Sequence, residues 1–256
     1  MSTAAVDDPI ARDLAIVLRW YPVTDSSRVV VWFTRHHGRV STLIKGSQRP
    51  KSWVLGQYDL FYTCELLFYR HAREDLHNFK ECAPLQRRAG LRSNWRGCAA
   101  ASHVADFLFR ATPPLAICET LFDLTTQMLD ELAAGASAPA LLFWFELQAL
   151  KDMGFAPDLS APLNEHPVFH YEEGRIRDAG QQGQHDGHHG TISGGVLAIL
   201  RRLLDESDPA RLRRLRLTPP QITELATHLE RFTTWHLELR LPARAYALEL
   251  MLRPAS

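Results

Sequence analysis

The hydrophobic pattern of this 256-residue chain changes its period near residue 85, and this change constrains the fold more than any other feature. Before it, short runs rich in β-branched and aromatic residues alternate with turn residues, which is the pattern of short strands. We expect five strands there, at residues 14–21, 28–34, 39–45, 58–69 and 76–85. Five short strands in about 85 residues suit a small closed barrel, and a five-stranded Greek-key barrel is one such solution.

After Pro84 the apolar residues recur with the helical period. We expect helices at these stripes, at residues 104–111, 115–132, 139–153 and 222–239. The third is apolar nearly all round in its first half, as in a buried helix. Thr218 before Pro219 and Pro220 has the pattern of an N-cap and first turn. The predicted fold class is therefore α+β, with a barrel domain at residues 1–85 and a helical domain at residues 86–256.

Residues 158–195 are rich in glycine and histidine, and we expect an inserted mobile loop or hairpin there. His185, His188 and His189 lie close together in sequence, and imidazole suits zinc. A structural zinc site needs four ligands at fixed spacing, however, and this segment contains no cysteine. We therefore expect a flexible polar loop and neither a metal nor another cofactor. A metal-dependent hydrolase that uses the histidines remains a rival hypothesis.

Positive charge is segregated along the chain, although 29 basic and 29 acidic residues give no net charge. Residues 26–58, here called the basic strip, hold no Asp or Glu. Its cations are Arg28, Arg35, Arg39, Lys45, Arg49 and Lys51. Residues 86–105 form a second acid-free stretch, with Arg87, Arg88, Arg92 and Arg96. Such segregation steers a polyanion, so we expect a nucleic-acid partner.

The strand expected at residues 39–45 gives the basic strip one charged face. Period-two alternation places Arg39 and Lys45 on one face and Val40, Thr42 and Ile44 on the other. The segment that follows adds Arg49 and Lys51, hydroxyls and a glycine, which suit phosphate oxygens without reading bases.

Among the aromatic residues, Trp53 lies inside the strip and is the best candidate to stack on bases, whereas Trp20, Tyr21 and Trp32 are more typical of a core. A solvated charged face on an unrelated barrel remains the alternative.

Catalytic signatures are absent from the sequence. It has no phosphate loop ending in Lys-Ser or Lys-Thr, no Gly-x-Ser-x-Gly elbow and no His-Glu-x-x-His helix, so we expect a protein that is not an enzyme. The four cysteines lie too far apart for a metal or redox motif, and we expect reduced thiols at Cys64, Cys82, Cys98 and Cys118. No run of about 18 apolar residues occurs, and acids rather than cations lie near Met1, so we expect a cytoplasmic protein.

Several short motifs, in this order and spacing, resemble the RecO family of bacterial DNA-repair and recombination mediators. In the first third they are Ala15-Ile16-Val17-Leu18-Arg19, residues 27–34, Gly38-Arg39-Val40, Lys45-Gly46 and Lys51-Ser52. Further along they are Phe145-Glu146-Leu147-x-x-Leu150 and Gly154-Phe155-x-Pro157. Many relatives carry a four-cysteine zinc site after the last motif, but residues 158–162 of this chain contain no cysteine, so zinc is not expected here.

The resemblance implies an OB-fold barrel joined to a helical domain, with binding of single- and double-stranded DNA and annealing of complementary strands. It implies two partners, RecR and the acidic tail of the single-stranded-DNA-binding protein (SSB), so that recombinase can load in RecF-pathway repair at the nucleoid. No ATP is expected. A DNA-contact role carries over to Arg39, Lys45, Arg49 and Lys51, and the basic strip adds Arg35 and Trp53.

The pocket for the acidic tail is assigned by charge alone, to Arg88, Arg92 and Arg96. The alternative is a generic OB-fold protein that binds single-stranded nucleic acid, RNA included, without the mediator partners.

Overall fold

The computed structural model describes residues 10–71, 76–136, 138–160, 167–178 and 189–253. Its contacts divide the chain into two compact units. The barrel unit comprises the chain up to residue 89 together with residues 108–126. The helical unit comprises residues 90–107 and 127 onward. Residues 108–126 thus belong to the barrel unit, although a segment of the helical unit precedes them along the chain.

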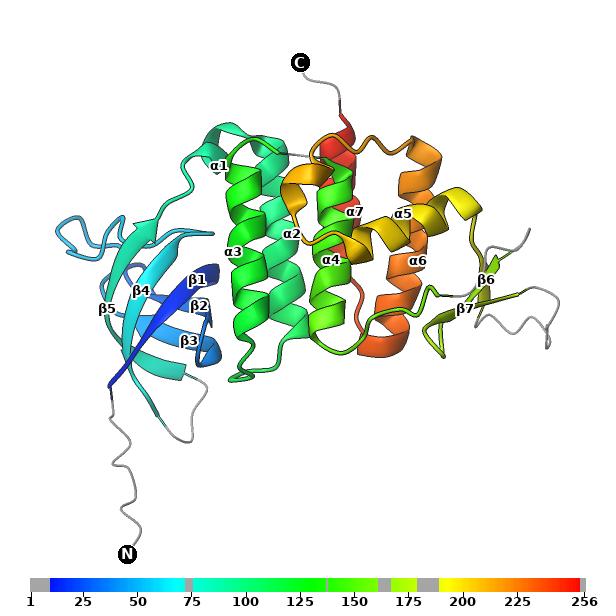
Figure 1. Ribbon diagram of the computed structural model, residues 1–256. Coiled ribbons are helices and arrows are strands. Elements are labelled where there is room, and N and C mark those ends of the chain that lie inside the picture. The colour runs from blue at the N-terminus through cyan, green and yellow to red at the C-terminus, as the bar shows by residue number, and fades with distance from the viewer. Residues whose placement is uncertain (1–9, 72–75, 137, 161–166, 179–188, 254–256) are drawn as a thin grey trace, which may run out of the picture. The chain divides into compact units, whose positions relative to one another are not determined.

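The first unit is built on a closed five-stranded barrel (Figure 1), which confirms the predicted α+β class and OB-like fold. Its strands are β1 (Ile10–Pro22), β2 (Arg28–Thr34), β3 (Gly38–Ile44), β4 (Thr63–Tyr69) and β5 (Leu76–Gln86). They close in the order β1-β2-β3-β5-β4. The β3–β5 pair is parallel, and the other pairs are antiparallel.

Strand β3 follows the expected alternation. Val40, Thr42 and Ile44 are buried, whereas the residues between them are only half-buried. Thr42 accepts a hydrogen bond from the indole Nε1 of the fully buried Trp32 at 2.8 Å, so this polar pair is satisfied inside the barrel. Trp32 is therefore a core residue and not a base-stacking one.

Two helices contribute residues to both units: α2 (Trp95–Ala111) and α3 (Glu119–Ala133). The link between them packs on the barrel. The rings of Phe33 and Phe122 lie 6.1 Å apart, and Leu115 N donates to Arg39 O at 3.2 Å. Gly38 has a φ of +67°, and a Cβ there would meet the Ala116 backbone at about 2.5 Å, so only glycine fits this turn.

The helical unit is organised around α4 (Pro139–Asp152), whose side chains from Ala140 to Leu147 are all buried. Its other helices are α1 (Gly90–Ser93), α5 (Gly194–Asp205), the 3-10 helix η2 (Pro209–Leu212), α6 (Pro219–Leu237) and α7 (Pro242–Leu252). Helices α5 and α6 pack against α4 (Figure 1). The predicted cap is confirmed, because Thr218 and Gln221 form a capping box at the start of α6.

The predicted insert contains a small sheet as well as loops. Strands β6 (Pro167–His170), β7 (Arg175–Asp178) and β8 (His189–Thr191) pair in the order β7-β6-β8, and the β6–β7 pair is a hairpin. Phe169 packs edge-on against Phe232 of α6 at 5.9 Å, which anchors the sheet on the helical unit. His185 and His188 lie outside the described residues. Within the described ranges, no helix is long and apolar enough to cross a membrane.

Candidate nucleic-acid interface

Arg35, which directly follows β2, is held by acidic residues of the same unit. Its Nη2 donates to the Asp123 carboxylate at 2.8 Å, and its Nε donates to Glu119 at 3.4 Å. Both acids lie on α3, far along the chain. The charge of Arg35 is therefore largely balanced, and this residue is a weak candidate for a phosphate contact.

Arg39 projects from the outward face of β3, as the alternation predicts. Its Nε donates to Thr112 O at 3.1 Å, and its guanidinium lies 4.8 Å from the centre of the Phe109 ring. Both partners belong to the barrel unit. Arg39 thus fastens the barrel to the segment around residue 110, and its side chain is only partly exposed.

The remaining cations, Lys45, Arg49 and Lys51, are here called the cation trio. All three are exposed in the connection between β3 and β4, and none makes an ion pair within the part of the chain that the structure describes. The connection is held by turns: Arg49 N donates to Gly46 O at 3.2 Å, and Gln48 N donates to Ser26 O at 3.0 Å. The trio therefore presents uncompensated positive charge from an ordered backbone.

Three of the candidate aromatic residues lie at the surface of the barrel unit, and one of them, Tyr21, is 41% exposed although we expected it in the core. Trp53 is 62% exposed and stacks on Phe79, with ring centroids 6.1 Å apart and planes at 27°. Trp20 is half-buried, and the Arg28 guanidinium lies 3.7 Å from the centre of its ring. Trp53 is consequently the most accessible of the three aromatic residues.

Sequence reasoning missed a carboxylate beneath the two histidines of the basic strip. The Asp13 side chain is buried, and its oxygens lie 2.8 Å from His36 Nδ1 and 2.7 Å from His37 Nδ1. Burial by itself would raise the pKa of Asp13, but hydrogen bonds from His37 and His36 outweigh it and lower that pKa. The histidines are thus engaged locally. The one signal in the sequence is a single acid directly before the apolar run at residues 14–21, inside what the structure shows to be β1.

The three arginines that we predicted to bind the acidic tail of a partner lie in different environments. Arg88 is only 5% exposed, and its Nη1 donates to Phe61 O at 2.6 Å and to Thr63 Oγ1 at 2.9 Å. It therefore holds the end of the barrel together, and a partner cannot reach its guanidinium, which corrects the prediction from charge. Arg92 is exposed on α1, and Arg96 on α2 is half-buried.

Arg96 lines a cavity of about 600 Å³ in the helical unit. Arg213 and Arg216 are its other basic residues. The large aliphatic side chains of the lining are those of Leu215, Leu217, Ile222, Met251 and Leu252. Arg96 Nη2 donates to Arg253 O, and Arg213 is paired with Glu131. The cavity combines a positive rim with an apolar surface, which suits an acidic segment that also carries apolar side chains.

Two family models together cover nearly the whole chain. Residues 10–88 match the model described as Recombination protein O N terminal, and residues 92–245 match Recombination protein O C terminal. The chain belongs to the RecO family. The first match comprises the five barrel strands, and the second begins in α1 and extends into α7.

Individual RecO proteins align over the same length. DNA repair protein RecO of Anaeromyxobacter dehalogenans (strain 2CP-1) is 30% identical over 255 residues, which covers 94% of this chain and 96% of that protein. The RecO of Moorella thermoacetica is 25% identical, covering 92% of this chain and 89% of that protein. These relatives are named as DNA repair proteins, so this chain is a member of a DNA repair family.

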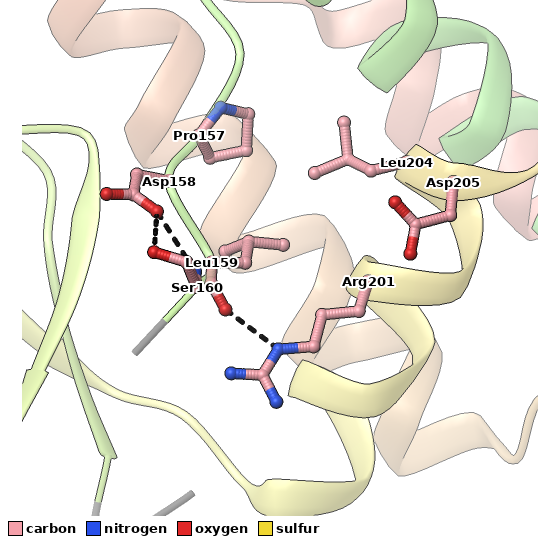
Figure 2. Close-up of a pocket in the computed structure, with 7 residues that line it drawn as sticks. All are labelled: Pro157, Asp158, Leu159, Ser160, Arg201, Leu204 and Asp205. Atoms are coloured by element: carbon pink, nitrogen blue, oxygen red, sulfur yellow. Dashed lines mark hydrogen bonds between the residues drawn. The ribbon is translucent and has the colours of Figure 1, made fainter. Parts of the chain in front are cut away.

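Residues 157–160, which follow α4, line a pocket of about 460 Å³ (Figure 2). Asp158 accepts hydrogen bonds from the backbone and side chain of Ser160, and Arg201 Nε donates to Leu159 O at 2.8 Å. Across the described residues, no three His, Cys, Asp or Glu side chains lie close enough to hold a metal. Zinc binding by the histidine-rich insert is not tested, because His185 and His188 lie outside those residues.

Proposed function

We propose that this RecO-family chain is a DNA repair and recombination mediator that binds single- and double-stranded DNA through its barrel and anneals complementary strands. The observation that carries the proposal is the cation trio. Lys45, Arg49 and Lys51 are exposed, lie on an ordered connection and make no ion pair within the described ranges. The proposed setting is the cytoplasm, at the nucleoid.

The chemistry of the trio fits a phosphate backbone of any sequence. Phosphate contacts position nucleic acid without reading it, and counterion release makes such binding strongly dependent on salt. Annealing requires two strands of like charge to approach each other, and cations that neutralise phosphates reduce this repulsion. Base pairing then supplies the free energy, so neither a nucleotide nor a catalytic residue is required.

The mediator role requires partners, and we assign the acidic tail of SSB to the cavity lined by Arg96. A tail that carries carboxylates and apolar side chains would place its charges beside Arg96 and Arg216 and its apolar groups against Leu217 and Met251. RecR is the second proposed partner, and together they would let recombinase load on SSB-coated DNA. Nothing in the described residues singles out a RecR-binding surface.

An annealing assay tests the proposal. Two complementary labelled strands should anneal faster with the protein than without it, in EDTA and without ATP. Charge reversal by Lys45→Glu with Lys51→Glu should remove most of that acceleration. The matched control reverses Lys151 and Arg202, two exposed cations of the helical unit. Equal activity in both double variants would contradict the trio as the interface, and inhibition by EDTA would favour the metal-dependent hydrolase.

A titration with a labelled acidic peptide from the SSB tail tests the partner. Wild type should bind the peptide, and Arg96→Glu with Arg216→Glu should weaken that binding at least about tenfold, since two charge-assisted contacts are lost. Arg202→Glu serves as control, because Arg202 is exposed on α5 and does not line the cavity. A wild-type protein that binds DNA but not the peptide would favour the generic single-strand-binding alternative.

A further inference from the structure

The Trp53 ring is exposed at a place where the barrel supports it from one side. Phe79 of β5 packs against the barrel core, and the Trp53 ring stacks on it with planes at 27°. A ring that is stacked on one face and still 62% exposed keeps its other face in water. If Trp53 only covered Phe79, burial of the whole indole would be favoured, because apolar area exposed to water is unfavourable.

The backbone around Trp53 is fixed before any ligand arrives. The next residue, Val54, is 2% exposed and belongs to the barrel core. Ser52 N donates to Arg49 O at 2.9 Å, and Leu55 N donates to Ser52 O at 3.1 Å, so successive turns flank the ring. A ring held in this way loses little conformational entropy when a partner stacks on it.

Positive charge lies close to the ring along the same connection. Lys51 and Arg49 precede Trp53 by two and four residues, and both are exposed. Exposed aromatic faces beside cations that follow a backbone are the pattern by which proteins bind single-stranded nucleic acid. In a duplex every base is already stacked and paired, so an aromatic face on the protein has no free base to contact except at the ends.

We propose that Trp53, supported from below by Phe79, is a base-stacking platform that makes the barrel prefer unpaired DNA over duplex. This inference rests on the proposed DNA-binding function and deepens it. The cation trio supplies binding to any phosphate backbone, and the Trp53–Phe79 stack adds a contact that only unpaired bases make. The expected ligand is single-stranded DNA of any sequence, because every base has an aromatic face.

The experiment compares two strands of equal length and charge, oligothymidylate and a strand of abasic sites. Wild type should bind oligothymidylate more tightly, since both strands offer phosphates but only one offers bases. Trp53→Ala should weaken binding to oligothymidylate by roughly 5-fold to 150-fold and leave the abasic strand unchanged. Trp53→Phe should retain most of the difference in affinity between the two strands. Oligothymidylate should quench part of the tryptophan fluorescence of wild type and a smaller part of that of Trp53→Ala.

Three controls separate stacking from charge, from the loss of any exposed tryptophan and from unfolding. Arg49→Glu with Lys51→Glu should weaken binding to both strands by similar factors. Trp235→Ala removes another exposed tryptophan, 42% exposed on α6, and should change neither affinity. Thermal unfolding of each variant establishes that it is folded.

The outcomes distinguish this inference from the function on which it rests. If Trp53→Ala keeps the wild-type ratio of the two affinities, or if wild type does not distinguish the strands, the stacking platform is wrong while DNA binding stands. If wild type binds neither strand, the proposed function itself fails.

Discussion

Arg244 of α7 and Glu146 of α4 form a bidentate ion pair from which water is excluded. Arg244 Nη2 donates to Glu146 Oε2 at 2.7 Å, Arg244 Nε donates to Oε1 at 2.9 Å, and the two side chains are 2% and 0% exposed. His103 of α2 lies 2.7 Å from the same carboxylate, and Arg244 Nη1 donates to Glu230 of α6 at 2.6 Å. One carboxylate therefore connects helices that are far apart in sequence.

Removing the charge of Glu146 should strongly destabilise the protein. Glu146→Gln leaves Arg244 buried with only Glu230 as a charged partner, and breaking a buried pair costs about 3–5 kcal/mol. Urea unfolding measures this loss. Glu230→Gln is the control, because the Glu230 side chain is 41% exposed and water can replace it. Similar losses of unfolding free energy in the two variants would contradict the conclusion that the buried carboxylate stabilises the fold more than the exposed one.

Stability should fall in acid through the same group. Burial alone would raise the pKa of Glu146, but the charges of Arg244 and His103 and their hydrogen bonds lower it to about 2. A lowered pKa in the folded state gives stability that is present above the unfolded value near 4.5 and lost as pH falls toward 2. The loss is on the order of 3 kcal/mol. The free energy of unfolding, measured at several pH values between 4.5 and 2, should change less with pH for Glu146→Gln than for wild type.

Arg88 should matter for stability and not for partner binding. Arg88→Met removes hydrogen bonds to Phe61 O and Thr63 Oγ1 inside the barrel, at a cost of about 1.5–3 kcal/mol. The affinity for the acidic peptide should stay at the wild-type value. Arg87→Met is the matched control, since that neighbour is exposed and its loss should cost little. Weaker peptide binding by a folded Arg88→Met would restore Arg88 as a partner contact.

The salt dependence of DNA binding should distinguish the cations of the basic strip that contact phosphates from those that do not. For single strands, each neutralised phosphate contributes about 0.7 to the slope of log affinity against log salt. Lys45→Ala with Lys51→Ala should flatten that slope by about 1.4. Arg35→Ala should change it little, because Asp123 and Glu119 already balance Arg35. A large change with Arg35→Ala would mean that DNA displaces those acids.

Much of the fold could be predicted because it is written in local patterns. The alternation at Val40, Thr42 and Ile44 identified β3 and its inward face, and Thr218 before two prolines identified the start of α6. Period and capping depend on neighbours along the chain, so they can be read without coordinates. The acid-free basic strip was equally visible, as were the motifs that resemble RecO.

The sequence alone thus determined the five barrel strands, the helices around α2, α3, α4 and α6, the family and the stretch of chain that carries excess positive charge. Only the tertiary structure decided which of those charges face solvent. Arg35 meets Asp123 across 88 residues of chain, and Arg88 is buried against Phe61, whereas the cation trio remains exposed without an ion-pair partner in the described ranges. The physical reason is that burial and ion pairing are set by long-range contacts, which the spacing of residues along a strand or helix does not encode.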